Sequence, residues 1–155
     1  YQSMVMLPIW NVVGMEKLPD GSWKFDLTRF DEYVRLADEA GVLKQMQIEE
    51  LGHRLVPSWT SPMGLFVPEF KDGKMQKETY APEDPRVRDF FSSFIPALKE
   101  HVEELGWGDR CYMKICDEPI DDNAGSYRAA VALIREFWPE MKVLEACQLS
   151  ITNIT

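Results

Sequence analysis

The pattern of apolar and polar positions along the chain predicts a regular succession of strands and helices. Residues 4–13 are a continuous apolar run, typical of a strand buried on both faces, and residues 43–50, 110–116 and 142–146 are also predicted to be strands. Between them, apolar residues recur at helical spacing in residues 28–41, 84–106 and 126–138. Strands and helices therefore alternate, and this order indicates a parallel sheet with right-handed crossover connections.

Local start and stop signals support these elements. Thr28 is a good N-cap for the first helix and Gly41 is a stop signal, while Asp84 is an N-cap for the second helix. Pro96 is expected to kink the second helix. Pro8 weakens the first strand, because proline cannot donate a hydrogen bond to a neighbouring strand.

Residues 56–84 lack a clear period. They are rich in Pro, Gly, Ser and Lys, with the aromatic residues Trp59, Phe66, Phe70 and Tyr80 among them. A connection this long in a compact domain is usually functional or disordered, and the aromatic residues favour an ordered segment packed over the domain. We therefore predict a long, ordered loop here.

The number of predicted units indicates α/β architecture of the TIM-barrel type, with four of its eight β/α units in this chain. No glycine-rich phosphate turn follows any predicted strand, so a nucleotide-binding open sheet lacks its usual support. A complete barrel takes about 250 residues, whereas this chain has 155. We therefore expect residues 1–155 to be part of a single barrel domain in a longer protein. The open edges of half a barrel would favour pairing with another chain.

Composition and charge narrow the classes of function. The chain is 45% hydrophobic, which is enough for a core, and its net charge of −9 argues against nucleic-acid binding. No apolar run approaches the ~20 residues that cross a bilayer, and no leader pattern begins the chain. Cys111, Cys116 and Cys147 are expected to be buried hydrophobes, with Cys111 and Cys116 on opposite faces of one strand and unbridged. His53 and His101 have no zinc-site spacing.

Two adjacent carboxylates, Asp117 and Glu118, end the third apolar run and precede Pro119. In β/α proteins, the chemistry is placed where strands end and loops begin. Neighbouring residues of an extended backbone point to opposite sides, so these carboxylates are expected to have different roles. The alternative is ordinary, because acidic residues also mark loop starts and helix N-termini.

Much of the chain, from residue 25 to residue 146, resembles the catalytic barrel of glycoside hydrolase family 123 and related uncharacterised bacterial barrel proteins. The matching pieces are FDLTRFDEY at 25–33, AG at 40–41, LGH at 51–53 and residues 112–119, which end in Asp-Glu-Pro. The Asp-Glu pair at a strand end is the most specific of these pieces.

The resemblance implies an enzyme that releases β-linked N-acetylgalactosamine, or another N-acetylhexosamine, with the acetamido group of the substrate as nucleophile. Glu118 would be the acid/base, and Asp117 would orient and stabilise the acetamido group. The chemistry agrees, because this reaction needs a proton donor at the leaving oxygen and a carboxylate at the amide N–H and the oxazolinium charge. The partner would be a glycan or glycoconjugate, no metal or organic cofactor would be required, and the family suggests an extracellular or periplasmic location.

Two other functions stay open. Asp117-Glu118-Pro119 also resembles the Asn-Glu-Pro strand end of the large retaining glycosidase clan, in which a second glutamate from a later strand is the nucleophile. Aspartate in place of that asparagine is better suited to an amide N–H, which favours the acetamido mechanism. The remaining alternative is a non-catalytic carbohydrate-binding barrel.

Six further residues are predicted to contact the sugar. They are His53, Trp59, Tyr112, Trp10, Asn11 and Glu49. Aromatic faces stack on sugar rings and exclude water, which is why the aromatic members are included. The alternative to sugar binding is an ordinary structural role, in which Trp10 packs in the core, Trp59 anchors the long segment and His53 bonds a backbone carbonyl. A further alternative is that Glu49, Glu50 and His53 bind a metal ion, as in a sugar isomerase.

Overall fold

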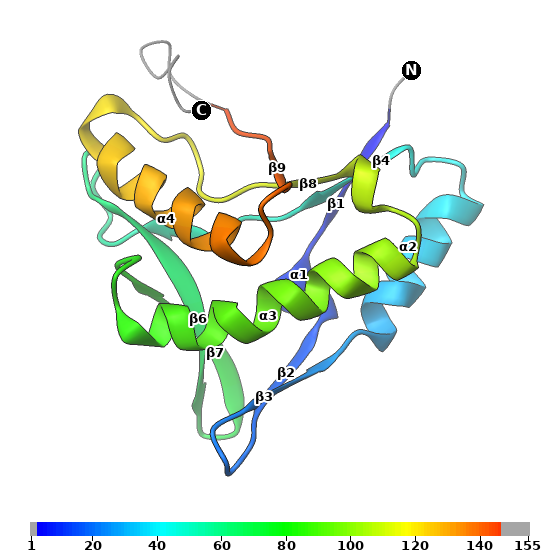
Figure 1. Cartoon of the computed structure of the whole chain (residues 1–155), viewed down its shortest axis with the longest axis horizontal. Helices are drawn as coiled ribbons and strands as arrows, with labels where there is room; N and C mark the ends of the chain where they lie inside the picture. Colours follow the sequence, from blue (N-terminus) through cyan, green and yellow to red (C-terminus); the bar gives the residue numbers. More distant parts are fainter. Residues whose placement is uncertain (1–2, 147–155) are drawn as a thin grey trace.

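The structure is a computed structural model that describes residues 3–146, and a four-stranded parallel sheet organises it (Figure 1). The strands pair in the order β1 (Met4–Leu7), β4 (Gln45–Ile48), β8 (Cys111–Met113) and β9 (Lys142–Val143). The last residue of each strand is the register partner of the last residue of the next. All four strands therefore end at one edge of the sheet, and the predicted parallel α/β arrangement is confirmed.

The strands are shorter than the apolar runs that predict them. The prediction of a single strand over residues 4–13 is wrong, because the run divides at Pro8 into β1 and a short helix α1 (Ile9–Val12), and β2 (Gly14–Lys17) begins only after it. The Pro8 carbonyl accepts hydrogen bonds from the backbone amides of Asn11 and Val12 at 2.8 and 3.1 Å. The chain thus turns where proline interrupts the strand.

The three predicted helices are present as α2 (Thr28–Glu39), α3 (Pro85–Glu104) and α4 (Ala124–Phe137). Asp84 caps α3 as expected, since its side chain accepts the Arg86 amide at 3.0 Å. Thr28 is not an N-cap. It is the first residue of α2, and Asp26 Oδ1 accepts both its amide and its hydroxyl, at 3.0 and 2.7 Å. Two short 3-10 helices, η1 (Gly108–Arg110) and η2 (Asp121–Asn123), precede β8 and α4.

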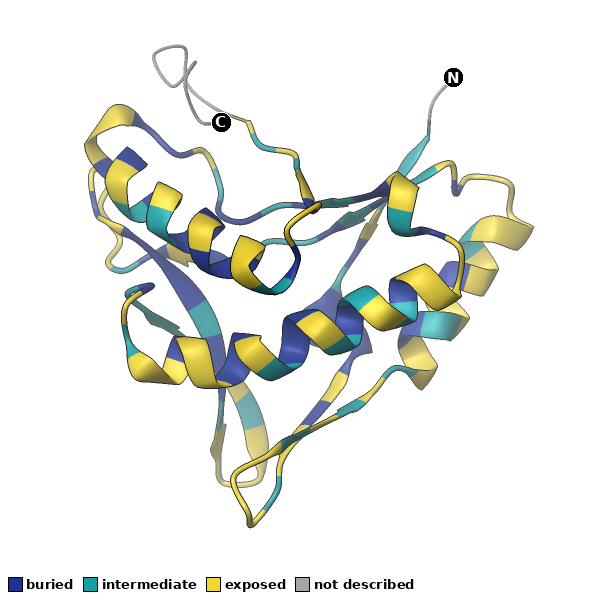
Figure 2. Ribbon diagram, viewed as in Figure 1, coloured by how far each residue is buried: buried dark blue, intermediate teal, exposed yellow. Residues whose placement is uncertain are grey.

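The helices bury one face each against the rest of the molecule and expose the other (Figure 2). On α3 the buried face carries Phe90, Phe91 and Phe94, at the helical spacing seen in the sequence. The Phe90 and Phe94 rings stack at 5.1 Å, and the Trp10 ring stacks on them at 6.0 and 6.4 Å. This aromatic cluster joins α3 to the segment that follows β1.

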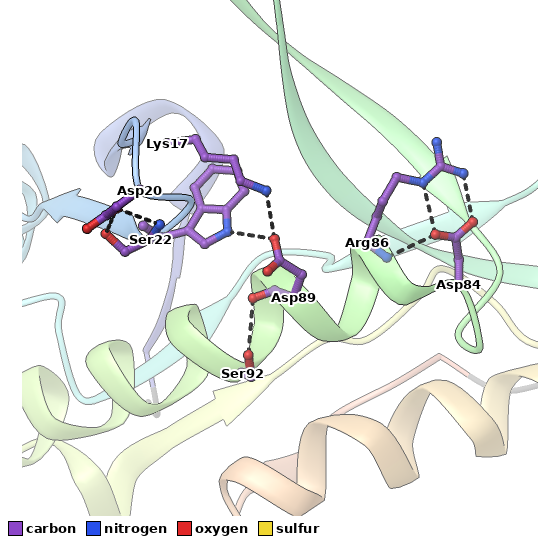
Figure 3. Close-up of polar contacts among 8 residues, drawn as sticks. Lys17, Asp20, Ser22, Asp84, Arg86, Asp89 and Ser92 are labelled. Carbon is purple, nitrogen blue, oxygen red and sulfur yellow. Dashed lines mark hydrogen bonds and ion pairs between the residues drawn. The ribbon is translucent and has the colours of Figure 1, made fainter.

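A small antiparallel hairpin, β2 with β3 (Trp23–Asp26), lies beside α3. Lys17 Nζ and Trp23 Nε1 reach Asp89 Oδ2 on α3 at 2.8 and 3.2 Å, while Asp20 Oδ1 accepts the Ser22 amide in the hairpin turn (Figure 3). Because these polar contacts are exposed, they contribute little to stability and mainly orient the hairpin relative to α3.

Residues 56–84, predicted to be one long loop, instead contain most of a second sheet. β6 (Met63–Lys71) pairs antiparallel with β7 (Lys74–Tyr80), and β5 (Gly52–Arg54) pairs with residues 63–65 of β6. Pro68 is compatible with β6 because β5 does not extend along it that far, so the strand has one neighbour at this position. The sheet lies between β4 and α3 in the chain, as part of the connection from a strand of the parallel sheet to the next long helix.

Two glycines allow β5 and β6 to approach closely. A Cβ atom on Gly52 would lie 1.9 Å from the Gly64 carbonyl oxygen. We expect Gly52→Ala to lower the free energy of unfolding by about 3 kcal/mol, because backbone atoms must shift. Urea denaturation measures this change. Gly125→Ala in α4, where no atom lies within 4 Å of the new Cβ, is the matched control and should cost nothing. A Gly52→Ala protein as stable as the wild type would contradict the expectation.

Cys111 and Cys116 are buried and free, as predicted, and Cys147 lies outside the described residues. No helix of the described part has the length and apolar character needed to cross a membrane. In the same part of the chain, β1 and β9 are the edges of the parallel sheet. Closure of this sheet into an eight-stranded barrel stays a prediction.

Candidate active site

The segments that follow the four parallel strands meet along the carboxyl edge of the sheet, where α/β proteins bind ligands. They are α1 after β1, Glu49 and Glu50 after β4, residues 114–118 after β8 and residues 144–146 after β9. Hydrogen bonds join neighbouring segments: Trp10 Nε1 donates to the Glu50 carbonyl at 2.8 Å. The predicted carboxylates thus lie in one of the segments that follow the parallel strands and that hydrogen bonds join to one another.

Asp117 is held in place by a lysine. Lys114 Nζ lies 2.6 Å from Asp117 Oδ1 and 2.8 Å from Glu50 Oε1. Burial lowers the pKa of Lys114, but its hydrogen bonds to Asp117 and Glu50 outweigh this effect and raise the pKa overall. The ammonium is therefore a fixed positive charge between two carboxylates. The Asp117 side chain remains 40% exposed, so a ligand can reach it.

Glu118 is exposed, and its carboxylate has no hydrogen bond or ion pair with any described residue. Its backbone φ is +45°, in the left-handed region that residues other than glycine rarely adopt. Residues 115–118, which we call the carboxylate turn, therefore place an unpaired carboxylate next to a paired one. The strained conformation marks the turn as a candidate functional feature.

The buried side chain of Arg54, at the end of β5, supports the carboxylate turn. Its Nη1 and Nη2 donate to the carbonyl oxygens of Asp117 and Glu118 at 3.3 and 2.9 Å, and its Nε donates to the Trp59 carbonyl at 3.0 Å. The guanidinium also lies 4.1 Å from the centroid of the Trp59 ring. The second sheet thereby fixes the backbone of the segment after β8 that carries the carboxylates. Because β8 ends at Met113 and Glu118 has a left-handed φ, the expected extended backbone at this pair is wrong.

Glu145, two residues after β9, contacts the carboxylate turn from another side. Its Oε1 accepts the backbone amides of Ile115 and Cys116 at 2.6 and 3.1 Å. Burial raises the pKa of Glu145 to about 7, although these amides, the Tyr127 hydroxyl and the Lys114 charge favour the ionised form. Oε2 is buried without a partner at hydrogen-bond distance among the described residues.

The raised pKa of Glu145 predicts a pH dependence of stability. Between the ordinary value of 4.5 and the folded value of about 7, the folded state keeps a proton that the unfolded state has lost. The free energy of unfolding of the wild type should therefore fall, relative to Glu145→Gln, by about 3 kcal/mol as pH rises through this window. Denaturant titrations at several pH values measure the difference. A difference that does not change between pH 4.5 and pH 7 would contradict the prediction.

Trp10, Asn11 and Glu49 lie at the carboxyl edge in different environments. Trp10 is 4% exposed and packs in the aromatic cluster, whereas Asn11 is exposed. Glu49 Oε1 accepts the Trp10 amide at 3.3 Å. Burial raises the pKa of Glu49, against the opposing effects of this hydrogen bond and the Lys77 charge. Of the three, Trp10 offers the least surface to a ligand.

His53, Trp59 and Tyr112 occupy three different settings. His53 is exposed on β5, next to the inward-facing Arg54. Trp59 is 49% exposed and stacks on the Arg54 guanidinium. Tyr112 is half-buried within β8, with Lys142 Nζ 5.7 Å from the centroid of its ring. Trp59 is thus joined to the carboxylate turn through Arg54, and contact of the three side chains with a sugar stays a prediction.

The structure brings in three residues that the sequence alone does not indicate, Lys114, Arg54 and Glu145. The alternating burial of β5, with His53 outward and Arg54 inward, becomes visible only once residues 52–54 are known to be a strand. Glu145 interrupts a short apolar run, which is the one signal that could have singled it out. Among the described residues, no group of three His, Cys, Asp or Glu side chains could hold a metal ion, and Glu49, Glu50 and His53 do not form one.

Comparison with known protein families places this chain among the catalytic domains of glycoside hydrolases. The family described as glycoside hydrolase 123, catalytic domain, matches residues 2–153, and the chain belongs to it, which confirms the resemblance. A family 123 glycoside hydrolase from Clostridium perfringens, whose structure was used to study glycolipid glycan hydrolysis, is similar with a TM-score of 0.64 and 18% identity. The match covers 97% of this chain and 27% of that one, and at this identity it shows a shared fold. No match was found among curated proteins.

Proposed function

We propose that this chain is the part of a glycoside hydrolase that carries its pair of catalytic carboxylates, and that the enzyme releases β-linked N-acetylhexosamine, most specifically N-acetylgalactosamine. The acetamido oxygen of the substrate attacks the anomeric carbon while Glu118 protonates the departing oxygen. Asp117 holds the acetamido N–H and stabilises the positive charge of the oxazolinium intermediate. Glu118 then takes a proton from the water that opens this intermediate.

The observation that carries the proposal is the unequal setting of the two carboxylates at the carboxyl edge. Asp117 is fixed by Lys114 at 2.6 Å, as a positioning carboxylate should be. Glu118 is exposed and free of ion pairs with described residues, as a group that exchanges protons with substrate and water should be. Different environments are what allow two neighbouring carboxyl groups to take different roles.

The same setting weighs against the alternatives. A non-catalytic carbohydrate-binding barrel would have no need of an exposed Glu118 on a strained backbone, and would be compatible with a Glu118 bonded to a basic side chain. The nearby cation, Arg54, instead bonds the backbone oxygens of the turn. A two-carboxylate glycosidase would need a second, accessible glutamate about 5 Å away as nucleophile. In that clan this glutamate comes from a later strand, beyond the strands of this chain, and Glu145, which follows β9, has its Oε1 engaged with two backbone amides.

A thiazoline analogue of the acetamido intermediate provides the test. We expect the galacto-configured thiazoline to inhibit the enzyme competitively, at least about 100-fold more tightly than free N-acetylgalactosamine, because the site is complementary to the bicyclic intermediate. Inhibition of the hydrolysis of an aryl β-N-acetylgalactosaminide measures this. Glucosides and galactosides without an acetamido group serve as control substrates and should not be cleaved.

Two outcomes would contradict the proposal in different ways. Cleavage of sugars without an acetamido group, together with weak thiazoline binding, would favour the two-carboxylate mechanism. Binding of N-acetylgalactosaminides without hydrolysis would favour the carbohydrate-binding barrel.

A further inference from the structure

Two polar side chains that the proposed mechanism does not use meet the backbone of the carboxylate turn. Before Asp117, Glu145 accepts the amides of residues 115 and 116. Within the turn, Arg54 donates to the carbonyl oxygens of Asp117 and Glu118. Glu145 binds the donors of the turn and Arg54 binds its acceptors. Arg54 is the last residue of β5 in the second sheet, whereas Glu145 follows β9 of the parallel sheet.

We propose that Glu145 and Arg54 are positioning residues that clamp the carboxylate turn and so set where the side chains of Asp117 and Glu118 meet the sugar. The effect of the clamp on rate rests on the proposed function. Its effect on the backbone does not. Glu145 and Arg54 would thus affect the reaction through the backbone of the carboxylate turn, without touching the substrate.

The burial of Arg54 argues for a positioning role. The side chain is 8% exposed, and its guanidinium bonds backbone carbonyls in place of a carboxylate. A buried charge without a counter-ion costs stability, which hydrogen bonds and the Trp59 ring offset only in part. Left-handed φ at a residue such as Glu118 costs a further ~1–3 kcal/mol and persists where its surroundings determine it. The planar fork of arginine can bind several fixed carbonyls at once, which a lysine ammonium cannot.

The geometry of Glu145 also supports a positioning role. A single oxygen, Oε1, binds two consecutive amides, so it holds the direction in which the chain enters the turn. The titratable groups that act on this carboxyl are the Lys114 ammonium and the Tyr127 hydroxyl, and its charge in turn acts on the Cys116 thiol. Leucine at position 145 would fill a similar volume without an acceptor, whereas glutamine would keep an acceptor oxygen.

Hydrogen exchange in the whole protein tests the clamp without any need for activity. We expect the amides of residues 115 and 116 to exchange about 10-fold faster, or more, in Glu145→Leu than in the wild type, because they lose their acceptor. Glu145→Gln should restore the slow exchange. NMR or mass spectrometry of the peptide that contains the carboxylate turn gives the rates, and Asp84→Ala, which removes the N-cap of α3, controls for a general loss of stability.

Kinetics test the consequence for catalysis. We expect Arg54→Lys and Glu145→Leu to lower kcat about 100-fold with KM nearly unchanged, since a small displacement of the proton donor acts on the transition state. Glu145→Gln and Asp84→Ala should keep kcat near that of the wild type. If Arg54→Lys does not fold, the two Glu145 variants still decide the question.

The outcomes separate the clamp from the proposed function. Unchanged exchange in a folded Glu145→Leu protein would overturn the clamp, whether or not the enzyme is active. Faster exchange with unchanged kcat would overturn its role in catalysis. A wild type inactive on every acetamido sugar, together with faster exchange in Glu145→Leu, would leave the clamp standing and remove the proposed function.

Discussion

Replacement of Glu118 by glutamine is expected to abolish measurable turnover of an aryl β-N-acetylgalactosaminide, with kcat reduced about 1,000-fold or more, while the protein stays folded. Glutamine has nearly the same size but has no acidic proton to give to the leaving oxygen. Because Glu118 is exposed and unpaired among the described residues, the substitution should leave the free energy of unfolding almost unchanged.

The choice of leaving group makes this experiment specific for proton donation. A dinitrophenyl leaving group departs with little protonation. The rate of the first step in Glu118→Gln should therefore fall much less with this group than with a poor leaving group. Glu104→Gln, at an exposed site near the end of α3, is the matched control and should be fully active. Equal losses for good and poor leaving groups would remove the donor role, and wild-type activity in Glu118→Gln would remove the assignment altogether.

Asp117→Asn is expected to retain substrate binding and to lose about 100- to 1,000-fold in kcat. Asparagine keeps an oxygen for the acetamido N–H but not the negative charge that stabilises the oxazolinium ion, so the loss falls on the transition state. Steady-state kinetics and a separate binding measurement with N-acetylgalactosamine give the two quantities.

Lys114 supplies the comparison for this variant. Glu50→Gln removes the other carboxylate partner of Lys114 but leaves the Asp117 carboxylate in place. A much smaller loss in Glu50→Gln than in Asp117→Asn would assign the effect to the Asp117 charge. Equal losses would show that the Lys114 network as a whole, and not Asp117, is what the reaction needs.

The parallel part of the fold could be predicted from the sequence because its signals are local. The aromatic spacing of α3, the Asp84 cap and the apolar runs of the strands each act within a few residues. The second sheet was missed because its strands carry contrary local signals. β6 contains Pro68, and β7 is largely polar, so the two strands depend on pairing with each other.

The candidate site was predictable to the same degree and for the same reason. Asp117 and Glu118 stand next to each other at the end of a recognisable run, and their adjacency is a property of the sequence. Arg54 and Glu145 act on that turn from 63 and 29 residues away, through backbone atoms that carry no sequence signal. The left-handed backbone of Glu118 likewise has no marker, because glutamate gives no indication that its φ is positive.

The stacking of Trp59 on Arg54 has a practical consequence. Trp59 is 49% exposed, whereas Trp23 is half-buried and Trp10, Trp107 and Trp138 are buried, so the Trp59 indole should contribute the longest-wavelength part of the intrinsic fluorescence. The guanidinium lies 4.1 Å from the centroid of the ring and also bonds the Glu118 carbonyl. A saccharide that covers the indole, or that displaces the arginine, should change the emission spectrum, so that association can be followed in real time without a dye or a chromogenic group.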